Sequence, residues 1–144
     1  MKCKYGLYTI GENTNLEMYL DQPSQKLRDA IDRGEGILYD AHPPVDSGNL
    51  GLYTVKNREV VLDKAKLHSF AMNNLRAQRN QALEVLDKEQ LKSIANQERI
   101  KKIESVKQEL RDVTQAIDLS QVNTVQDAFH ISPPVLMTYM EDIQ

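Results

Sequence analysis

Three histidines and one cysteine are among the side chains of this 144-residue chain that could serve as general bases, nucleophiles or soft metal ligands. His42, His68 and His130 lie far apart in the sequence, and none belongs to a His-x-x-x-His pair of the zinc-protease kind. Asp40 could form an acid–base pair with His42. In the alternative interpretation, Asp40 has a structural role and anchors the proline loop that follows His42. We therefore interpret the histidines as surface or helix-end residues.

The single cysteine, Cys3, excludes an internal disulfide framework and a cysteine-based metal cluster. A reactive thiol needs a base and an electropositive pocket, whereas Lys2 and Lys4 would point to the opposite face of a strand from Cys3. The glycines of 6–11 and 34–36 do not form a phosphate-binding motif. The sequence predicts a chain with no catalytic residues, no cofactor and no metal.

The charge balance argues against nucleic acid and membranes as partners. The net charge is −3, from 18 basic and 21 acidic side chains, and the lysines and arginines of 62–119 alternate with acidic residues. Nucleic-acid binding also uses aromatic side chains on which bases stack. The only phenylalanine, tyrosine or tryptophan residues in 62–132 are Phe70 and Phe129. No apolar run approaches the roughly 20 residues of a membrane span, and no apolar signal core follows the first residues. We expect an intracellular or virion-borne chain.

The distribution of glycine and proline divides the chain into three parts. All six glycines lie at or before Gly51, residues 52–132 contain neither glycine nor proline, and the last two prolines are Pro133 and Pro134. We predict an α+β chain: a β-rich head over 1–62, a helical arm over 63–119, and a tail over 120–144 that holds a short helix and an extended segment.

The head alternates short β-forming runs with turn residues. A helix over 24–33 is predicted to begin at Ser24 and to end at Gly34. A tight hairpin is predicted around Asn57, which tolerates a left-handed backbone. The predicted strands are 5–10, 16–20, 36–39, 50–55 and 59–62, and the segment 42–48 is predicted to be a loop.

Apolar residues in the arm recur at helical spacing. One helix is predicted from Asp63 over about 24 residues, and a second from Asp87, three residues before Gln90, over about 31 residues. The spacing after Ile103 alternates threes and fours as in a coiled coil, and the pattern loses register around 96–99. Two such helices form either an antiparallel hairpin or one nearly continuous rod.

A helix with one apolar stripe must bury that stripe, so we expect the arm to associate with a second copy or with a partner. In the tail, Val122, Val125 and Phe129 line a short helix, and 135–140 forms an apolar strip that closes onto the head or docks into a neighbour. Arg76 and Arg79 could pair with carboxylates across the arm. The predicted interaction residues are Arg76, Arg79, Leu110, Val113, Ile117, Phe129, Val135, Leu136, Met137 and Tyr139.

The order of elements and one motif resemble a known protein family. The strand pair of 52–61 leads into a helix that carries Arg76-Ala77-Gln78-Arg79-Asn80-Gln81-Ala82-Leu83, followed by Asp87. This Arg-x-x-Arg-Asn-x-x-Leu pattern with a following Asp resembles the small tail-assembly and tail-fibre-assembly proteins of tailed bacteriophages. Lys88 stands where that family often has an aromatic residue, and the chain has no tryptophan.

The resemblance implies a non-enzymatic structural or assembly protein of a phage tail, baseplate or fibre attachment. Its partners would be other tail or fibre proteins and a second copy of the chain, in the virion tail or in the host cytoplasm during assembly. One alternative is a cellular adaptor or regulator that dimerises through the helical arm. A third is a small enzyme that uses Asp40, His42 or Cys3.

Overall fold

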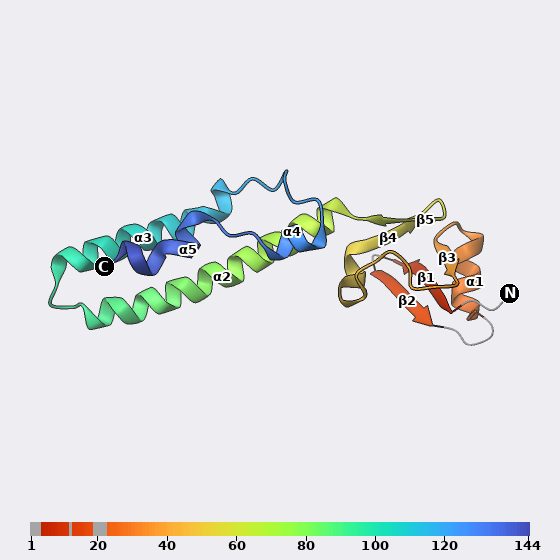
Figure 1. The fold of residues 1–144 in the computed structure, drawn as a ribbon, viewed down its shortest axis with the longest axis horizontal. Coiled ribbons are helices and arrows are strands. Elements are labelled where there is room, and N and C mark those ends of the chain that lie inside the picture. The colour runs from red at the N-terminus through yellow and green to blue at the C-terminus, as the bar shows by residue number, and fades with distance from the viewer. Residues whose placement is uncertain (1–3, 12, 19–22) are drawn as a thin grey trace. The chain divides into compact units, whose positions relative to one another are not determined.

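The computed structural model describes residues 4–11, 13–18 and 23–144, and it confirms the predicted α+β fold. Small antiparallel sheets come first, and two long helices packed as a hairpin follow, with a further helix near the C-terminus (Figure 1). The chain forms two compact units, which we call the head unit, Met1–Leu67, and the helical unit, His68–Gln144. Cys3 and the last two residues of the predicted strand 16–20 lie outside the described residues.

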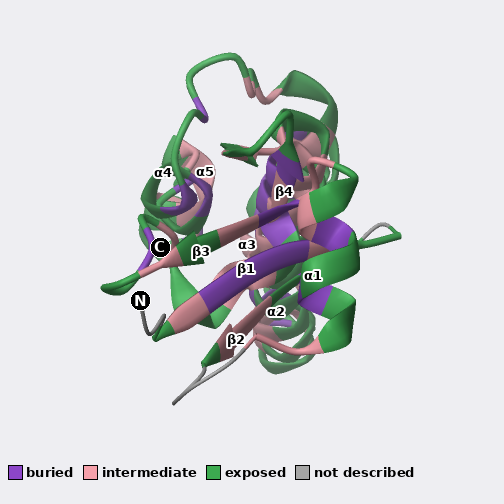
Figure 2. Cartoon of the chain, turned by 90° about the vertical axis from the view of Figure 1, so that its right-hand side faces the viewer, coloured by how far each residue is buried: buried purple, intermediate pink, exposed green. Residues whose placement is uncertain are grey.

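The head unit is built around β1, Tyr5–Ile10, which pairs antiparallel with β2, Asn13–Met18, on one side and with β3, Gly36–Tyr39, on the other. Figure 2 shows the burial along β1, with α1, Gln25–Asp32, beside the sheet. The predicted caps of α1 are confirmed. Ser24 accepts a hydrogen bond from the backbone N–H of Leu27 at 3.2 Å, and Gly34 follows the helix with a φ of 76°. The core of the unit, formed by Tyr8, Leu27 and Ala30, lies where α1 meets β1.

A second, two-stranded sheet ends the head unit. It pairs β4, Tyr53–Lys56, with β5, Glu59–Leu62. The predicted strand over 50–55 begins too early, because a 3₁₀ segment, η1, occupies Ser47–Leu52. Asp46 caps η1 by accepting a hydrogen bond from the N–H of Gly48 at 3.0 Å, and this local contact competes with strand formation.

The turn of this hairpin holds two left-handed residues, Asn57 with a φ of 52° and Arg58 with a φ of 64°. Positive φ at both central residues defines a type I′ turn, for which Asn-Gly is a preferred sequence. Arg58→Gly is expected to stabilise the head unit by about 1 kcal/mol, because glycine adopts this conformation without the clash of a Cβ atom. Thermal or denaturant unfolding would measure the gain. Arg58→Ala is the matched control, since it removes the side chain but keeps Cβ, and an equal gain from it would contradict the explanation.

The helical unit contains the hairpin of α2, Lys64–Lys92, which begins at the end of the head unit, and α3, Gln97–Ala116 (Figure 1). The predicted start of the second helix at Asp87 is wrong, because α2 continues to Lys92. Asp87 pairs with Lys107 of α3, and Asn96 caps α3 by accepting a hydrogen bond from the N–H of Arg99 at 3.1 Å. The core of the hairpin consists of Ala82, Leu86, Ile103, Val106, Leu110 and Ile143.

Two short helices follow the hairpin. The short helix predicted from Val122, Val125 and Phe129 is present in part as α4, Val125–Phe129. Val122 lies before it, because a capping box between Thr124 and Asp127 fixes the start of the helix. The prediction of an extended segment over 135–140 is wrong, because these residues belong to α5, Pro134–Asp142. Proline is favoured at the first position of a helix, where its missing N–H has no intrahelical partner to lose and its φ is already helical. The proline pair therefore starts α5 and does not keep the chain extended.

Candidate functional site

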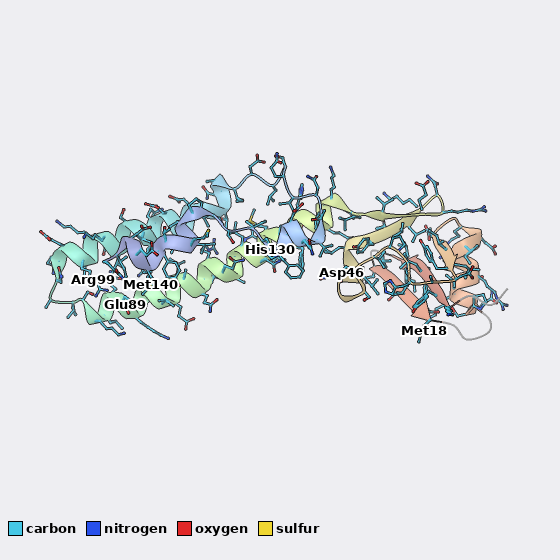
Figure 3. All side chains as sticks on the ribbon, in the orientation of Figure 1. Met18, Asp46, Glu89, Arg99, His130 and Met140 are labelled. Atoms are coloured by element: carbon cyan, nitrogen blue, oxygen red, sulfur yellow. The ribbon has the colours of Figure 1, made fainter. Side chains whose placement is uncertain are left out.

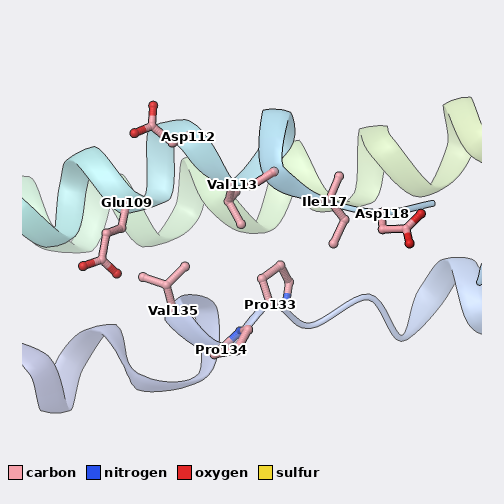
Figure 4. Close-up of a pocket in the computed structure, with 9 residues that line it drawn as sticks. Glu109, Asp112, Val113, Ile117, Asp118, Pro133, Pro134 and Val135 are labelled. Carbon is pink, nitrogen blue, oxygen red and sulfur yellow. The ribbon is translucent and has the colours of Figure 1, made fainter. Parts of the chain in front are cut away.

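An apolar groove lies in the helical unit, between the C-terminal end of α3 and the segment that leads into α5. Its apolar walls are formed by Val113, Ala116 and Ile117 on one side and by Pro133, Pro134 and Val135 on the other. Figure 4 shows Glu109 and Val113 projecting from α3 toward that segment. The volume of about 500 Å³ falls in the range typical of ligand-binding clefts in proteins.

The charged side chains that line the groove are all acidic: Glu109, Asp112 and Asp118. Asp118 accepts a hydrogen bond from the N–H of Ser120 at 2.9 Å, and bonds from the Ser120 side chain and backbone lower the pKa of Asp118. Its carboxylate is therefore ionised at neutral pH. Asp112 accepts a hydrogen bond from the side-chain amide of Gln108 at 3.1 Å. Because this amide is neutral, the bond does not compensate the negative charge of Asp112.

Several of the predicted interaction residues are used inside the chain. Leu110 is fully buried and Val113 nearly so, and Val135, Leu136 and Tyr139 pack against the core of the hairpin. The apolar faces of α2 and α3 are thus covered in part by α5 of the same chain. Val113 and Val135 also line the groove, together with the half-buried Ile117.

Two of the predicted apolar interaction residues are exposed. Met137, on α5, is 71% exposed. Phe129, at the end of α4, is 48% exposed, and its ring contacts that of Phe70 edge to face, with ring centres 5.1 Å apart.

Arg76 and Arg79 lie on the part of α2 that carries the motif. Arg76 is exposed and donates to the side-chain oxygen of Asn73 at 3.4 Å. Arg79 donates to the side-chain oxygen of Asn80 at 3.1 Å and reaches across the hairpin to the hydroxyl of Thr114 at 3.5 Å. The partner of Arg79 across the arm is thus a hydroxyl group rather than a carboxylate.

The turn between α2 and α3 is held by a polar network that sequence reasoning missed. Arg99 donates to the carboxylate of Glu89 at 3.1 Å, to the hydroxyl of Ser93 at 2.8 Å and to the carbonyl oxygen of Ile143 at 3.4 Å (Figure 3 labels Arg99 and Glu89). Lys92 and Arg99 together lower the pKa of Glu89, with the hydrogen bond from Lys92 as the largest cause. The loss of helical register around 96–99 was the only sign of this turn in the sequence.

Two exposed aliphatic residues mark the same end of the hairpin. Leu91 is 74% exposed and Ile94 is 72% exposed, and both line a shallow hollow of about 430 Å³ together with Ile100. The sequence pattern had assigned Leu91 and Ile94 to the buried stripe of the second helix. Leu91 comes five residues after the buried Leu86 and so does not share its inward face of α2, and Ile94 lies beyond the last residue of the helix.

Each of the three histidines makes a structural contact within its own unit. His42, in the head unit, hydrogen-bonds through Nδ1 to the carbonyl oxygen of Pro43 at 2.7 Å. His68 hydrogen-bonds through Nε2 to the carbonyl oxygen of Val122 at 3.3 Å, and His130 follows α4 as its C-terminal cap. Across the described ranges no three His, Cys, Asp or Glu side chains are grouped so as to hold a metal ion. Among the same residues, no helix is both long and apolar enough to cross a membrane.

No protein-family model, curated protein or solved structure matches this chain. The assignment of a function therefore depends on the motif, the groove and the exposed apolar residues themselves.

Proposed function

We propose that this chain is a non-enzymatic structural or assembly protein of a tailed bacteriophage, which acts in the tail, the baseplate or the attachment of fibres. It works through contacts of its helical unit with other tail or fibre proteins and with a second copy of itself.

The observation that carries the proposal is the apolar surface that the helical unit leaves exposed after its own core is complete. Leu91, Ile94 and Met137 extend large apolar side chains into solvent although α5 already covers the hairpin. The groove beside α3 adds a concave apolar surface. Exposed apolar surface combined with a concave apolar site is typical of proteins that bind other proteins.

The phage assignment within this proposal comes from the motif. Leu75 and Leu83 of the motif stretch lie on the inner face of α2, where Leu75 is fully buried and Leu83 packs against the hairpin core. The arginines lie outside that core. In this motif the leucines therefore support the fold, whereas the arginines are charged residues that are accessible to a partner.

Mass spectrometry of purified virions tests the proposal, with the soluble fraction of the same lysate analysed alongside. We expect the chain to copurify with particles in stoichiometric amount if it is a structural component. If it is an assembly protein, we expect it only in the lysate, in complex with a tail or fibre protein. In both cases deletion of the gene should reduce the yield of complete particles.

Two results would contradict the proposal. One is a chain that is missing from particles and whose deletion leaves fully infectious virions. The other is a stable dimer that binds host proteins alone, which would favour the adaptor or regulator alternative. Light scattering after size exclusion would give the oligomeric state in either case.

A further inference from the structure

We propose that the groove between α3 and α5 binds a basic, apolar segment of a partner protein. In that complex an aliphatic or aromatic side chain enters between Val113 and Val135, and lysine or arginine side chains lie over Glu109, Asp112 or Asp118. This inference rests on the proposed function, because it specifies the chemistry of a partner that contacts the helical unit.

The side chains around the groove accept hydrogen bonds and offer no donors. Its polar side chains are three carboxylates, and all the other lining residues are aliphatic or proline. An ionised carboxylate only accepts hydrogen bonds, whereas lysine and arginine only donate them. A partner that satisfies these groups on binding must therefore bring donors, and cationic donors form the strongest such bonds.

The end of α3 increases this preference for cations. The last carbonyl groups of a helix have no partner within the helix and carry partial negative charge, which basic residues in the last turn usually offset. The last turn of α3 has no basic residue of its own, and Arg79 of α2 contacts it through the hydroxyl of Thr114 at 3.5 Å. Ala116 and Ile117, at the end of the helix, line the groove. The carbonyl groups at the end of α3 and the carboxylates of the groove thus both attract a bound cation.

The opposite wall offsets this effect only in part. α5 begins beside the groove, and the N-terminus of a helix ordinarily attracts negative charge through its free N–H groups. Here Pro133 precedes the helix and Pro134 is its first residue, with no side-chain cap. Proline has no backbone N–H, so two of the donors that such a terminus would offer are missing.

The apolar walls require that the partner also bury an apolar side chain. Val113, Ile117 and Val135 face a volume large enough for more than one side chain. A lysine-rich segment without apolar side chains would leave these three residues in contact with water. A partner with both features gains apolar burial in the groove and charge pairing at its rim.

Selection of a random dodecamer peptide library against the full chain tests this inference. We expect the enriched peptides to combine lysine or arginine with leucine, isoleucine, methionine or phenylalanine. A synthetic copy of the best peptide should bind roughly tenfold more weakly to a variant with Glu109→Gln, Asp112→Asn and Asp118→Asn, because three rim pairs of modest strength are lost. Ala116→Phe, which fills the groove from an exposed position, should abolish binding without any change in charge.

The matched control is a variant with Glu84→Gln, Glu98→Gln and Glu141→Gln, which removes the same number of negative charges from exposed positions of the helical unit outside the groove. This control should bind the peptide nearly as well as the original chain. The inference is overturned if no peptide is enriched, if the enriched peptides are neutral or acidic, or if the groove variants and the control bind equally.

This result is separate from the test of the proposed function. A chain that binds basic, apolar peptides in the groove but takes no part in building particles would keep the inference and lose the phage assignment. A chain found in virions that enriches no such peptide would keep the assignment and lose the inference.

Discussion

Leu110→Ala is expected to destabilise the helical unit by about 2–5 kcal/mol. Leu110 has no exposed surface and lies in the core shared by α2, α3 and Ile143. The substitution removes the isopropyl part of the side chain, which loses apolar burial and leaves a cavity that the packed helices fill only in part. Denaturant unfolding followed by the helical circular dichroism signal would measure the change.

Leu91→Ala is the matched control for this substitution, because it makes the same chemical change at a leucine that is 74% exposed. Its effect on the free energy of unfolding should stay within about 0.5 kcal/mol. The pair also distinguishes the hairpin from a continuous rod. In a rod Leu110 would be exposed on an isolated helix, and the two substitutions would then have similar, small effects.

Local signals in the sequence were sufficient for much of the head unit. Ser24 and Gly34 determine the ends of α1 through contacts within a few residues, and the strand-forming run of 5–10 needs only its own composition. The 3₁₀ segment at Ser47–Leu52 was missed because its cap, Asp46, competes with a strand pattern of similar strength.

The end of α2 could not be predicted because it depends on contacts between segments distant in the sequence. Asp87 followed by Gln90 has the form of a weak helix start, yet in the structure both side chains contact Lys107. Lys107 is nearly buried, and this pairing compensates its burial in the middle of the hairpin. The turn forms a few residues later, where Asn96 caps α3 and Arg99 binds Glu89 and Ser93.

The groove illustrates the same limit. The sequence singled out Val113, Ile117 and Val135 as interaction residues from their apolar character alone. It gave no reason to group them with Glu109, Asp112 and Asp118, because the two walls come together only when α5 folds back along α3. The charge of the groove, and with it the predicted chemistry of the partner, is a property of this tertiary contact.

Ile143→Ala is expected to cost about 2–5 kcal/mol, and its effect should begin at α5. Ile143 is 1% exposed and belongs to the hairpin core, although no periodic pattern in the sequence marked it. Its carbonyl oxygen accepts a hydrogen bond from Arg99, and the next residue, Gln144, accepts one from Lys102. The side chain of Ile143 is thus the apolar anchor of a segment whose backbone is tied to α3.

Amide hydrogen exchange would locate the effect of this substitution. We expect exchange in α5 to accelerate more than in the centres of α2 and α3, because a helix of nine residues has little stability without tertiary packing. Ile94→Ala makes the same chemical change at an isoleucine that is 72% exposed, and it should leave α5 protected. Equal acceleration in α2, α3 and α5 would mean that α5 unfolds only with the whole unit. No acceleration would mean that Ile143 does not anchor α5.

Because Val135 of α5 forms one wall of the groove, loosening α5 should also weaken the binding of basic, apolar peptides, whereas Ile94→Ala should not.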